Sequence, residues 1–217
     1  GDGRVVDFDY KPDNPNGRLV AAEIFLFDAR ALLDALDALA DEQEELADYG
    51  DDLVPWFLAH RTVVEHRLRG YWMDLGTPQS YWTAHMQLLD GDGAPLNDDT
   101  WPILSAQPHL LPAAVIGSAE VADSLIAEGA TVSGTVLHSV VGIGAAVDEG
   151  ATVRNSVILD GARIKSGAHV INAIVDADAV VESGTYGARD RITIVDESGA
   201  VSESNPFDRK QLLPRGM

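Results

Sequence analysis

The acid with the most distinctive surroundings is Asp74, in the segment 70–77 that reads GYWMDLGT. Two aromatic residues precede this lone carboxylate, a Gly-Thr pair follows it, and Pro78 comes next. Asp74 is therefore either a catalytic carboxylate or part of a turn that begins a helix. In the second interpretation Thr77 caps the helix, and Pro78 takes the first helical position, where its missing N–H is tolerated.

The composition limits what such a site could act on. The chain has 217 residues, a formal charge of −20 and no cysteine, so disulfides and thiolate metal sites are excluded. The charge argues against binding nucleic acid or acidic membranes, and an anionic substrate would need a local basic pocket or a divalent cation. No apolar run reaches the roughly 18 residues of a membrane span, and the N-terminus lacks a signal-peptide pattern. We therefore expect a soluble, cytoplasmic protein.

Residues 1–100 have the mixed pattern of an α/β domain. A helix is predicted after Asp28, a candidate N-cap, because leucines follow it at helical spacing. Another helix should begin at Pro78, and residues 90–102 have the composition of a linker. Runs of β-branched and aromatic residues predict strands over 4–10, 19–27 and 62–68, and a short helix is expected over 52–60.

From about residue 113 the sequence repeats itself. Residues 139–155 (SVVGIGAAVDEGATVRN) and 156–172 (SVILDGARIKSGAHVIN) match in length, and shorter units occupy 124–138 and 173–187. Aliphatic residues recur every five or six positions, with small residues between them. The aligned columns are Val141 with Ile158 and Val175, Val147 with Ile164 and Val181, and Val136 with Val153 and Val170.

This pattern resembles the left-handed parallel β-helix of hexapeptide type. Short strands joined by tight turns close a triangular coil of about 17 or 18 residues, and stacked coils bury the aliphatic columns. About four such coils fit between residues 113 and 187. Residues 192–201 could add a strand that covers the open end, and residues 204–217 are expected at the surface.

Two histidines fall inside the repeats, and enzymes built on this β-helix often use a histidine for acyl transfer. His138 shares its column with Asn155 and Asn172, at a turn corner where a polar ladder is expected. His169 shares its column with Thr152 and faces outward by strand alternation. A structural role is the preferred interpretation for both, and a β-helix acyltransferase is kept as an alternative.

Several segments together resemble the sugar-1-phosphate nucleotidyltransferases, and within them the bacterial glucose-1-phosphate adenylyltransferase family. They are RVVDFDYKPDNP, IFLFDARALL, ADYGDDLVPWFL and GYWMDLGTPQSYWTAH, in the family's order and followed by the hexapeptide repeats. The resemblance covers essentially the whole chain. It implies that residues 1–100 are the C-terminal, sugar-phosphate side of a Rossmann-like α/β catalytic domain with its linker. Residues 101–217 would then be the all-β left-handed β-helix with a C-terminal tail.

The resemblance also implies a reaction and residues that serve it. Glucose 1-phosphate attacks the α-phosphorus of ATP, which gives ADP-glucose and pyrophosphate for glycogen or α-glucan synthesis. Two acids hold Mg²⁺, which screens the phosphates, and Asp74 corresponds to the second acid. Lys11 corresponds to the lysine that grips the sugar phosphate, for which a compact ammonium is suited. A solvated loop lysine and a turn acid remain the alternatives for these two residues.

The sequence departs from the family at the sugar site. The family's Glu-Lys-Pro reads Tyr10-Lys11-Pro12 here, and a serine and a glycine near the sugar correspond to Ala21 and Glu23. Glu23 is either a displaced sugar contact or a solvent-facing strand acid. Tyr49, Gly50 and Asp52 are expected to be structural.

The family's glycine-rich nucleotide loop and the first metal-binding acid have no counterpart in this sequence. We therefore expect the chain to be the C-terminal half of a longer enzyme and inactive in nucleotidyl transfer by itself. For the full-length enzyme the resemblance implies ATP and glucose 1-phosphate as partners, a homo-oligomer of four subunits, and allosteric effectors bound between the catalytic domain and the β-helix. Neither nucleic acid nor membrane is implied. The main alternative is a noncatalytic regulatory or scaffold subunit of the same family.

Overall fold

The protein is described from a computed structural model, which covers residues 3–12, 14, 17–43, 45–106, 108–188 and 191–203. The chain divides into two compact units, residues 1–70 and 71–217, and each is described by itself. The segment 204–217, expected at the surface, lies outside the described residues. In the part of the chain that the structure describes, no helix is long and apolar enough to cross a membrane.

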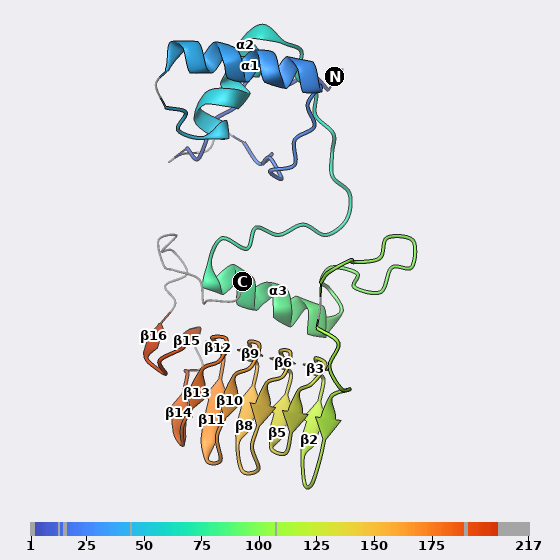
Figure 1. Cartoon of the computed structure of the whole chain (residues 1–217), viewed down its shortest axis with the longest axis vertical. Coiled ribbons are helices and arrows are strands. Elements are labelled where there is room, and N and C mark those ends of the chain that lie inside the picture. Colours follow the sequence, from blue (N-terminus) through green and yellow to red (C-terminus); the bar gives the residue numbers. More distant parts are fainter. Residues whose placement is uncertain are drawn as a thin grey trace. The chain divides into compact units, whose positions relative to one another are not determined.

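The first unit is built around two helices and a π-helical turn (Figure 1). Helix α1 spans Ala29–Glu42 and begins where Asp28 Oδ1 accepts the N–H of Ala31 at 2.9 Å, which confirms the predicted N-cap. The π-helical turn η1, Tyr49–Leu53, leads directly into α2, Val54–His60. The small core between the helices consists of Ala35, Leu39, Val54 and Phe57.

The three strands predicted for this unit do not form a sheet. Within its described residues the only β-bridge joins Arg4 to Val64, supported by a 2.9 Å bond from the N–H of Val5 to the carbonyl of Val63. Residues 19–27 carry no ladder, and the backbone bends at Glu23, where φ is 55°. The physical reason is that a strand is stable only when its backbone groups pair with a neighbouring strand, and residue type alone does not supply that neighbour.

The second unit begins with a well-capped helix, α3, Pro78–Asp90. Thr77 Oγ1 accepts the N–H of Ser80, and Ser80 Oγ accepts the N–H of Thr77, each at 3.1 Å. This reciprocal pair is a capping box, and Pro78 occupies the first helical position as predicted. Gly91 ends the helix in the left-handed conformation, with φ 80°.

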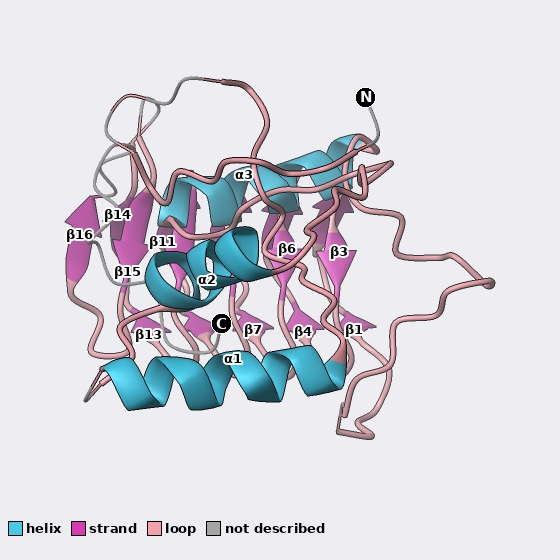
Figure 2. Cartoon of the chain, turned by 90° about the horizontal axis from the view of Figure 1, so that it is seen from above, coloured by secondary structure: helices cyan, strands magenta, loops and turns pink. Residues whose placement is uncertain are grey.

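The repeats fold into a parallel β-solenoid of about five turns, consistent with the left-handed β-helix expected. About four coils were expected; the fifth turn is completed by β15 from the tail. Its short strands form three sheets, and Figure 2 shows strands of the first sheet side by side.

The first sheet has the order β1-β4-β7-β10-β13, with bounds Ala114–Val115, Thr131–Val132, Ala146–Val147, Arg163–Ile164 and Val180–Val181. The second has the order β14-β11-β8-β5-β2, with bounds Gly184–Tyr186, Ala168–Ile171, Thr152–Arg154, Thr135–Leu137 and Glu120–Ala122. The third has the order β16-β15-β12-β9-β6-β3, with bounds Val201–Glu203, Thr193–Val195, Ala173–Val175, Val157–Ile158, Val140–Val141 and Leu125–Ile126.

The register confirms the aliphatic columns. Ile158 pairs with Val141 on one side and Val175 on the other, and all three are 0% exposed. The other two columns pair in the same way and are equally buried. A strand from residues 192–201 was expected at the open end, and β15 takes that place by continuing the third sheet. A further strand, β16, pairs with β15 antiparallel. Such a strand covers the exposed edge of the stack.

Helix α3 lies against the third sheet (Figure 1). Met86, which is 5% exposed, packs with Val157 of β9 and Ile174 of β12. Tyr81, Trp82 and Leu89 complete this contact from the helix side. The helix that follows the Asp74 segment is therefore part of the same compact unit as the β-helix.

Candidate active site

Lys11 lies beside Tyr10 in a small polar and aromatic cluster of the first unit. Its Nζ is 4.4 Å from the centre of the Tyr10 ring, a distance at which a cation is attracted to the ring face. The Tyr10 hydroxyl donates to Asp48 Oδ2 at 2.7 Å. The pKa of Lys11 is raised, first by its interaction with the Tyr10 hydroxyl and then by the negative charges of Asp48 and Glu23. The ammonium therefore stays charged to a higher pH than an ordinary lysine does.

Asp48 was not singled out from the sequence, although its position before η1 is that of a helix cap. Besides the Tyr10 hydroxyl it accepts the N–H of Gly50 at 3.2 Å, and these bonds lower its pKa. A Cβ on Gly50 would clash with the Tyr10 ring, so the ring needs glycine at this position. Asp52 accepts the N–H of Ala47 at 2.7 Å, a backbone contact in keeping with the structural role expected for it.

Glu23 belongs to the same cluster. Its carboxylate interacts with the Tyr49 hydroxyl and raises the pKa of that phenol to about 12. The Tyr49 ring meets the Tyr10 ring edge-on, with centroids 5.8 Å apart. Glu23 and Lys11 both have positive φ, 55° and 45°, which is uncommon for residues with a side chain and is often found at functional sites. The structure therefore brings Lys11 and Glu23 into one network through two tyrosines.

Asp74 lies in the second unit, in the turn that leads into α3. Its Oδ1 accepts the N–H of Gly76 at 2.9 Å, and the residue is exposed. This is an Asx-type turn, in which a short carboxylate bonds to the backbone two residues on. Asp74 therefore has the turn role, and the only hydrogen bond found for its side chain among the described residues is the one through Oδ1.

The arrangement around Asp74 fits one ligand of a magnesium site. Mg²⁺ is commonly held by one or two carboxylates together with substrate phosphates, and keeps several waters. Across the described residues, no group of three or more His, Cys, Asp or Glu side chains is arranged to hold a metal ion. A cation at Asp74 would therefore depend on oxygens from the substrate or from residues outside this set.

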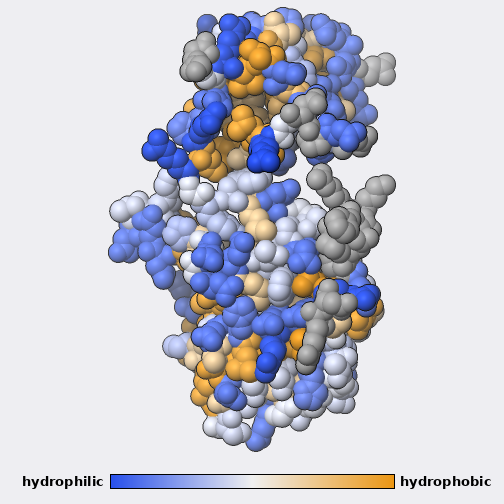
Figure 3. Space-filling view, turned by 180° about the vertical axis from the view of Figure 1, so that it is seen from behind, coloured by the Kyte–Doolittle hydropathy of each residue, from blue (hydrophilic) through white to orange (hydrophobic). Residues whose placement is uncertain are grey.

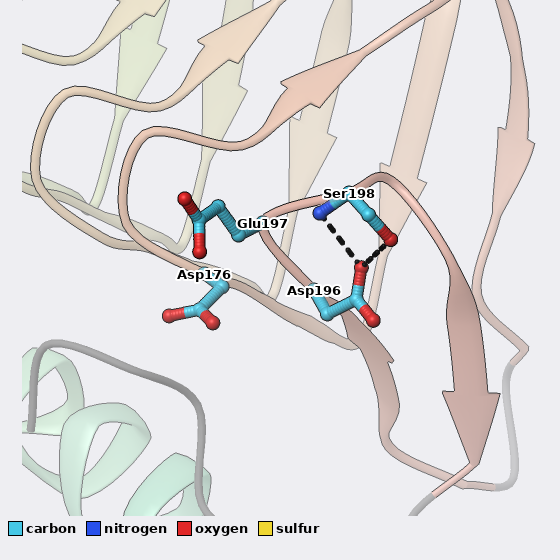
Figure 4. Close-up of a pocket in the computed structure, with 4 residues that line it drawn as sticks. All are labelled: Asp176, Asp196, Glu197 and Ser198. Atoms are coloured by element: carbon cyan, nitrogen blue, oxygen red, sulfur yellow. Dashed lines mark hydrogen bonds between the residues drawn. The ribbon is translucent and has the colours of Figure 1, made fainter.

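A second acidic site lies at the far end of the β-helix and has a different character (Figure 4). Asp176, Asp196, Glu197 and Ser198 line a hollow of about 200 Å³. Asp196 Oδ1 accepts bonds from the N–H and hydroxyl of Ser198 at 2.9 and 2.6 Å, so this carboxylate shapes a turn. We assign no chemistry to it.

The two histidines occupy the structural positions expected for them. His138, Asn155 and Asn172 have φ of 47°, 46° and 48°, so the column is a row of left-handed corners. His138 bonds to Asn155 Oδ1 and to Asp90 Oδ1, each at 3.0 Å. His169 pairs in the second sheet with Thr152 and Thr185, and it is exposed.

Residues 1–91 match the family model described as nucleotidyl transferase, and residues 112–198 match GlmU-like, C-terminal hexapeptide. The glucose-1-phosphate adenylyltransferases of Bacillus mycoides (strain KBAB4) and Bacillus anthracis are both similar to this chain. Each is 37% identical over 149 residues, which is 68% of this chain and 40% of the relative. The protein of that name from Bacillus cytotoxicus is 36% identical over the same length. The chain therefore spans about 40% of the length of the curated relatives it matches.

Proposed function

We propose that the chain is the sugar-phosphate side of a glucose-1-phosphate adenylyltransferase, because residues 1–91 match the nucleotidyl transferase family model and residues 112–198 match the GlmU-like hexapeptide model. The observation that carries this proposal is the 37% identity to enzymes of that name over 149 residues. The proposed reaction joins ATP and glucose 1-phosphate to give ADP-glucose and pyrophosphate. Assembly into a homo-oligomer in the cytoplasm and control by effectors beside the β-helix are part of the proposal.

In this proposal Lys11 binds the phosphate of the sugar substrate. Its ammonium is exposed and lies 4.4 Å from the centre of the Tyr10 ring. A charged hydrogen bond of this kind contributes about 1.5–3 kcal/mol. Glu23, whose carboxylate interacts with Tyr49, would orient a sugar hydroxyl.

Asp74 would be one ligand of Mg²⁺ in the same proposal. When bound, the cation screens the phosphates and orients the in-line attack. The contribution of this chain is to fix the carboxylate: the bond to Gly76 orients Asp74, and the capped start of α3 fixes the turn. Preorganised charge of this type is usually the largest catalytic effect in phosphoryl transfer.

The test uses the longest natural protein that contains this chain, assayed for pyrophosphate release from ATP and glucose 1-phosphate. Asp74→Asn should lower kcat by about 100-fold, within the range for loss of one transition-state stabiliser. Lys11→Gln should weaken glucose 1-phosphate binding by about tenfold or more, since 1.4 kcal/mol is tenfold. Asp92→Asn, at an exposed residue, and Lys165→Gln, at a partly exposed residue that pairs with Asp148 at 3.8 Å, are matched controls outside the proposed site. An unchanged rate in Asp74→Asn would remove the role proposed for this acid.

A noncatalytic regulatory subunit is the second candidate, and one observation favours it. Tyr10 stands where the resemblance places a glutamate, and its hydroxyl is occupied by Asp48. Calorimetry of ligand binding and an assay of pyrophosphate release together distinguish the two candidates. A regulatory subunit binds its ligand but releases no pyrophosphate at any substrate concentration. Restoring the acid with Tyr10→Glu should raise turnover only if the site is catalytic. We do not propose the acyltransferase, because His138 is engaged by Asp90 and Asn155.

A further inference from the structure

Asp74 is joined to α3 by an unbroken series of short contacts. Its Oδ1 bonds to the N–H of Gly76, and the next residue, Thr77, closes the capping box with Ser80. Only two residues separate the carboxylate from the helix cap. The direction of the Asp74 side chain is therefore set by the position of α3.

The position of α3 is set in turn by the β-helix. Met86 is 5% exposed and packs against Val157 and Ile174, which are 1% and 0% exposed. Apolar contact of this kind holds the helix on the sheet but permits sliding, because burial has no preferred direction. A defined position along the sheet requires directional bonds.

Two hydrogen bonds supply that direction, and both end on the same corner of the β-helix. Trp82 Nε1 donates to the backbone carbonyl of Asn155 at 2.7 Å, near the middle of α3. At the end of the helix, Asp90 Oδ1 accepts from His138 Nε2 at 3.0 Å. The other ring nitrogen of His138, Nδ1, lies 3.0 Å from Asn155 Oδ1. Asn155 thus contacts Trp82 of the helix directly and is linked to Asp90 only through His138.

The identity of His138 has a physical reason within its column. The other residues of the column, Asn155 and Asn172, are asparagines in the same left-handed conformation. An asparagine carries its polar atoms at one end of a short side chain, whereas imidazole has nitrogens on opposite edges of a ring. Histidine can therefore face Asn155 and Asp90 at the same time, donating from both nitrogens when the ring is protonated and from one of them when it is neutral. This is the function that an asparagine at position 138 would lack.

We propose that His138, Asn155 and Trp82 are positioning residues that fix α3 along the β-helix and thereby hold Asp74 in place for the reaction. The inference rests on the role of Asp74 given under the proposed function. It assigns the β-helix a part in catalysis that is separate from assembly or effector binding. The coupling passes through packed, hydrogen-bonded elements within one compact unit.

The central experiment compares His138→Asn with His169→Asn in the longest natural protein that contains the chain. The first keeps the residue type of the column and removes only the reach to Asp90; the second makes the same change at an exposed position of the second sheet. Hydrogen exchange of residues 74–90 and steady-state kinetics are measured for both. Since a misplacement of about 1 Å can cost about 100-fold in rate, we expect His138→Asn to lower kcat about tenfold. The half-saturating Mg²⁺ concentration should rise, while KM for glucose 1-phosphate stays within about twofold.

Exchange in residues 74–90 should accelerate in His138→Asn, and β-helix protection should be retained. Trp82→Phe, which keeps the ring packing and loses the N–H, should give the same pattern. Faster exchange with unchanged kcat would overturn the positioning proposal and leave the role of Asp74 standing. Lower kcat without faster exchange would overturn it also, as would equal effects of His169→Asn. If Asp74→Asn as a single substitution has no effect on kcat, the proposed role of Asp74 is wrong, and the positioning proposal that rests on it is wrong as well.

Discussion

The first unit and the β-helix differ in where their apolar side chains lie. In the β-helix the aligned valines and isoleucines are essentially 0% exposed. In the first unit Leu26 is 101% exposed and Val6 is 83% exposed, and apolar side chains gather on its surface (Figure 3). The difference teaches that the repeats supply both partners of each contact, one turn apart along the chain. The strand-like segments of the first unit have no such repeat, so their sequence does not indicate which segment each would pair with.

The largest expected effect on stability comes from comparing two substitutions by alanine, one in each unit. Ile158→Ala removes a side chain that is 0% exposed and leaves a cavity in the stack, which costs about 2–5 kcal/mol. Leu26→Ala removes a fully exposed side chain and should change stability by no more than about 0.5 kcal/mol. Urea unfolding followed by circular dichroism measures both. Equal effects would contradict the burial contrast between the units.

A smaller effect is expected at the left-handed corners that join the strands. Asn172 has φ 48°, and its Nδ2 donates to the carbonyl of Ala188 at 2.8 Å. Asn172→Ala should lower stability by about 1–2 kcal/mol, because a Cβ without a local hydrogen bond is strained there. Asn172→Gly tolerates the same φ and should be less destabilised than the alanine variant. If alanine proves the more stable of the two in the same unfolding assay, strain is not the cause.

The same contrast explains how much could be predicted from the sequence. The columns of the β-helix were predictable because neighbours in space lie at a constant separation along the chain, as Val153 and Val170 do. The turn at Asp74 was predictable because Thr77 and Pro78 act locally. The bond between His138 and Asp90 was not predictable, since it joins residues 48 positions apart and depends on how α3 docks. The role of Asp48 in the Lys11 cluster depends in the same way on a bond to Tyr10, 38 positions away.

The stability of the unit that contains α3 should depend on pH, because the protonation of His85 on this helix differs between the folded and unfolded chain. Burial lowers the pKa of His85 below its ordinary value of 6.5, opposed only in part by the bond to the carbonyl of Tyr81. Below 6.5 the unfolded chain binds this proton more readily than the folded chain does, so stability is full above 6.5 and falls as the pH decreases. Melting temperatures at several pH values between about 5 and 7.5 measure the slope. His85→Gln should flatten it, while His66→Gln, an exposed site in the first unit, should leave it unchanged.

The smallest expected effect concerns the polar cluster that the first unit has in place of a large apolar core. Glu23 raises the pKa of Tyr49 to about 12, because ionising the phenol would break its hydrogen bond and place two negative charges together. A raised folded pKa contributes stability that is present below the ordinary value of 10.0 and is lost as the pH rises through about 12. Ultraviolet absorbance of tyrosinate during an alkaline titration reports this group directly.

Glu23→Gln should return the titration of Tyr49 toward 10.0, because the substitution removes the charge while the side chain keeps its size. Tyr81 serves as an internal reference, since burial, first of all, raises its pKa in the second unit and Glu23 is not among the causes. The change should therefore be confined to one tyrosine. A titration curve that is the same in both proteins would show that Glu23 is free of Tyr49. In that case the carboxylate is available to a sugar with no competing bond, and the first unit has one contact fewer to hold Lys11 and Tyr10 in their cluster.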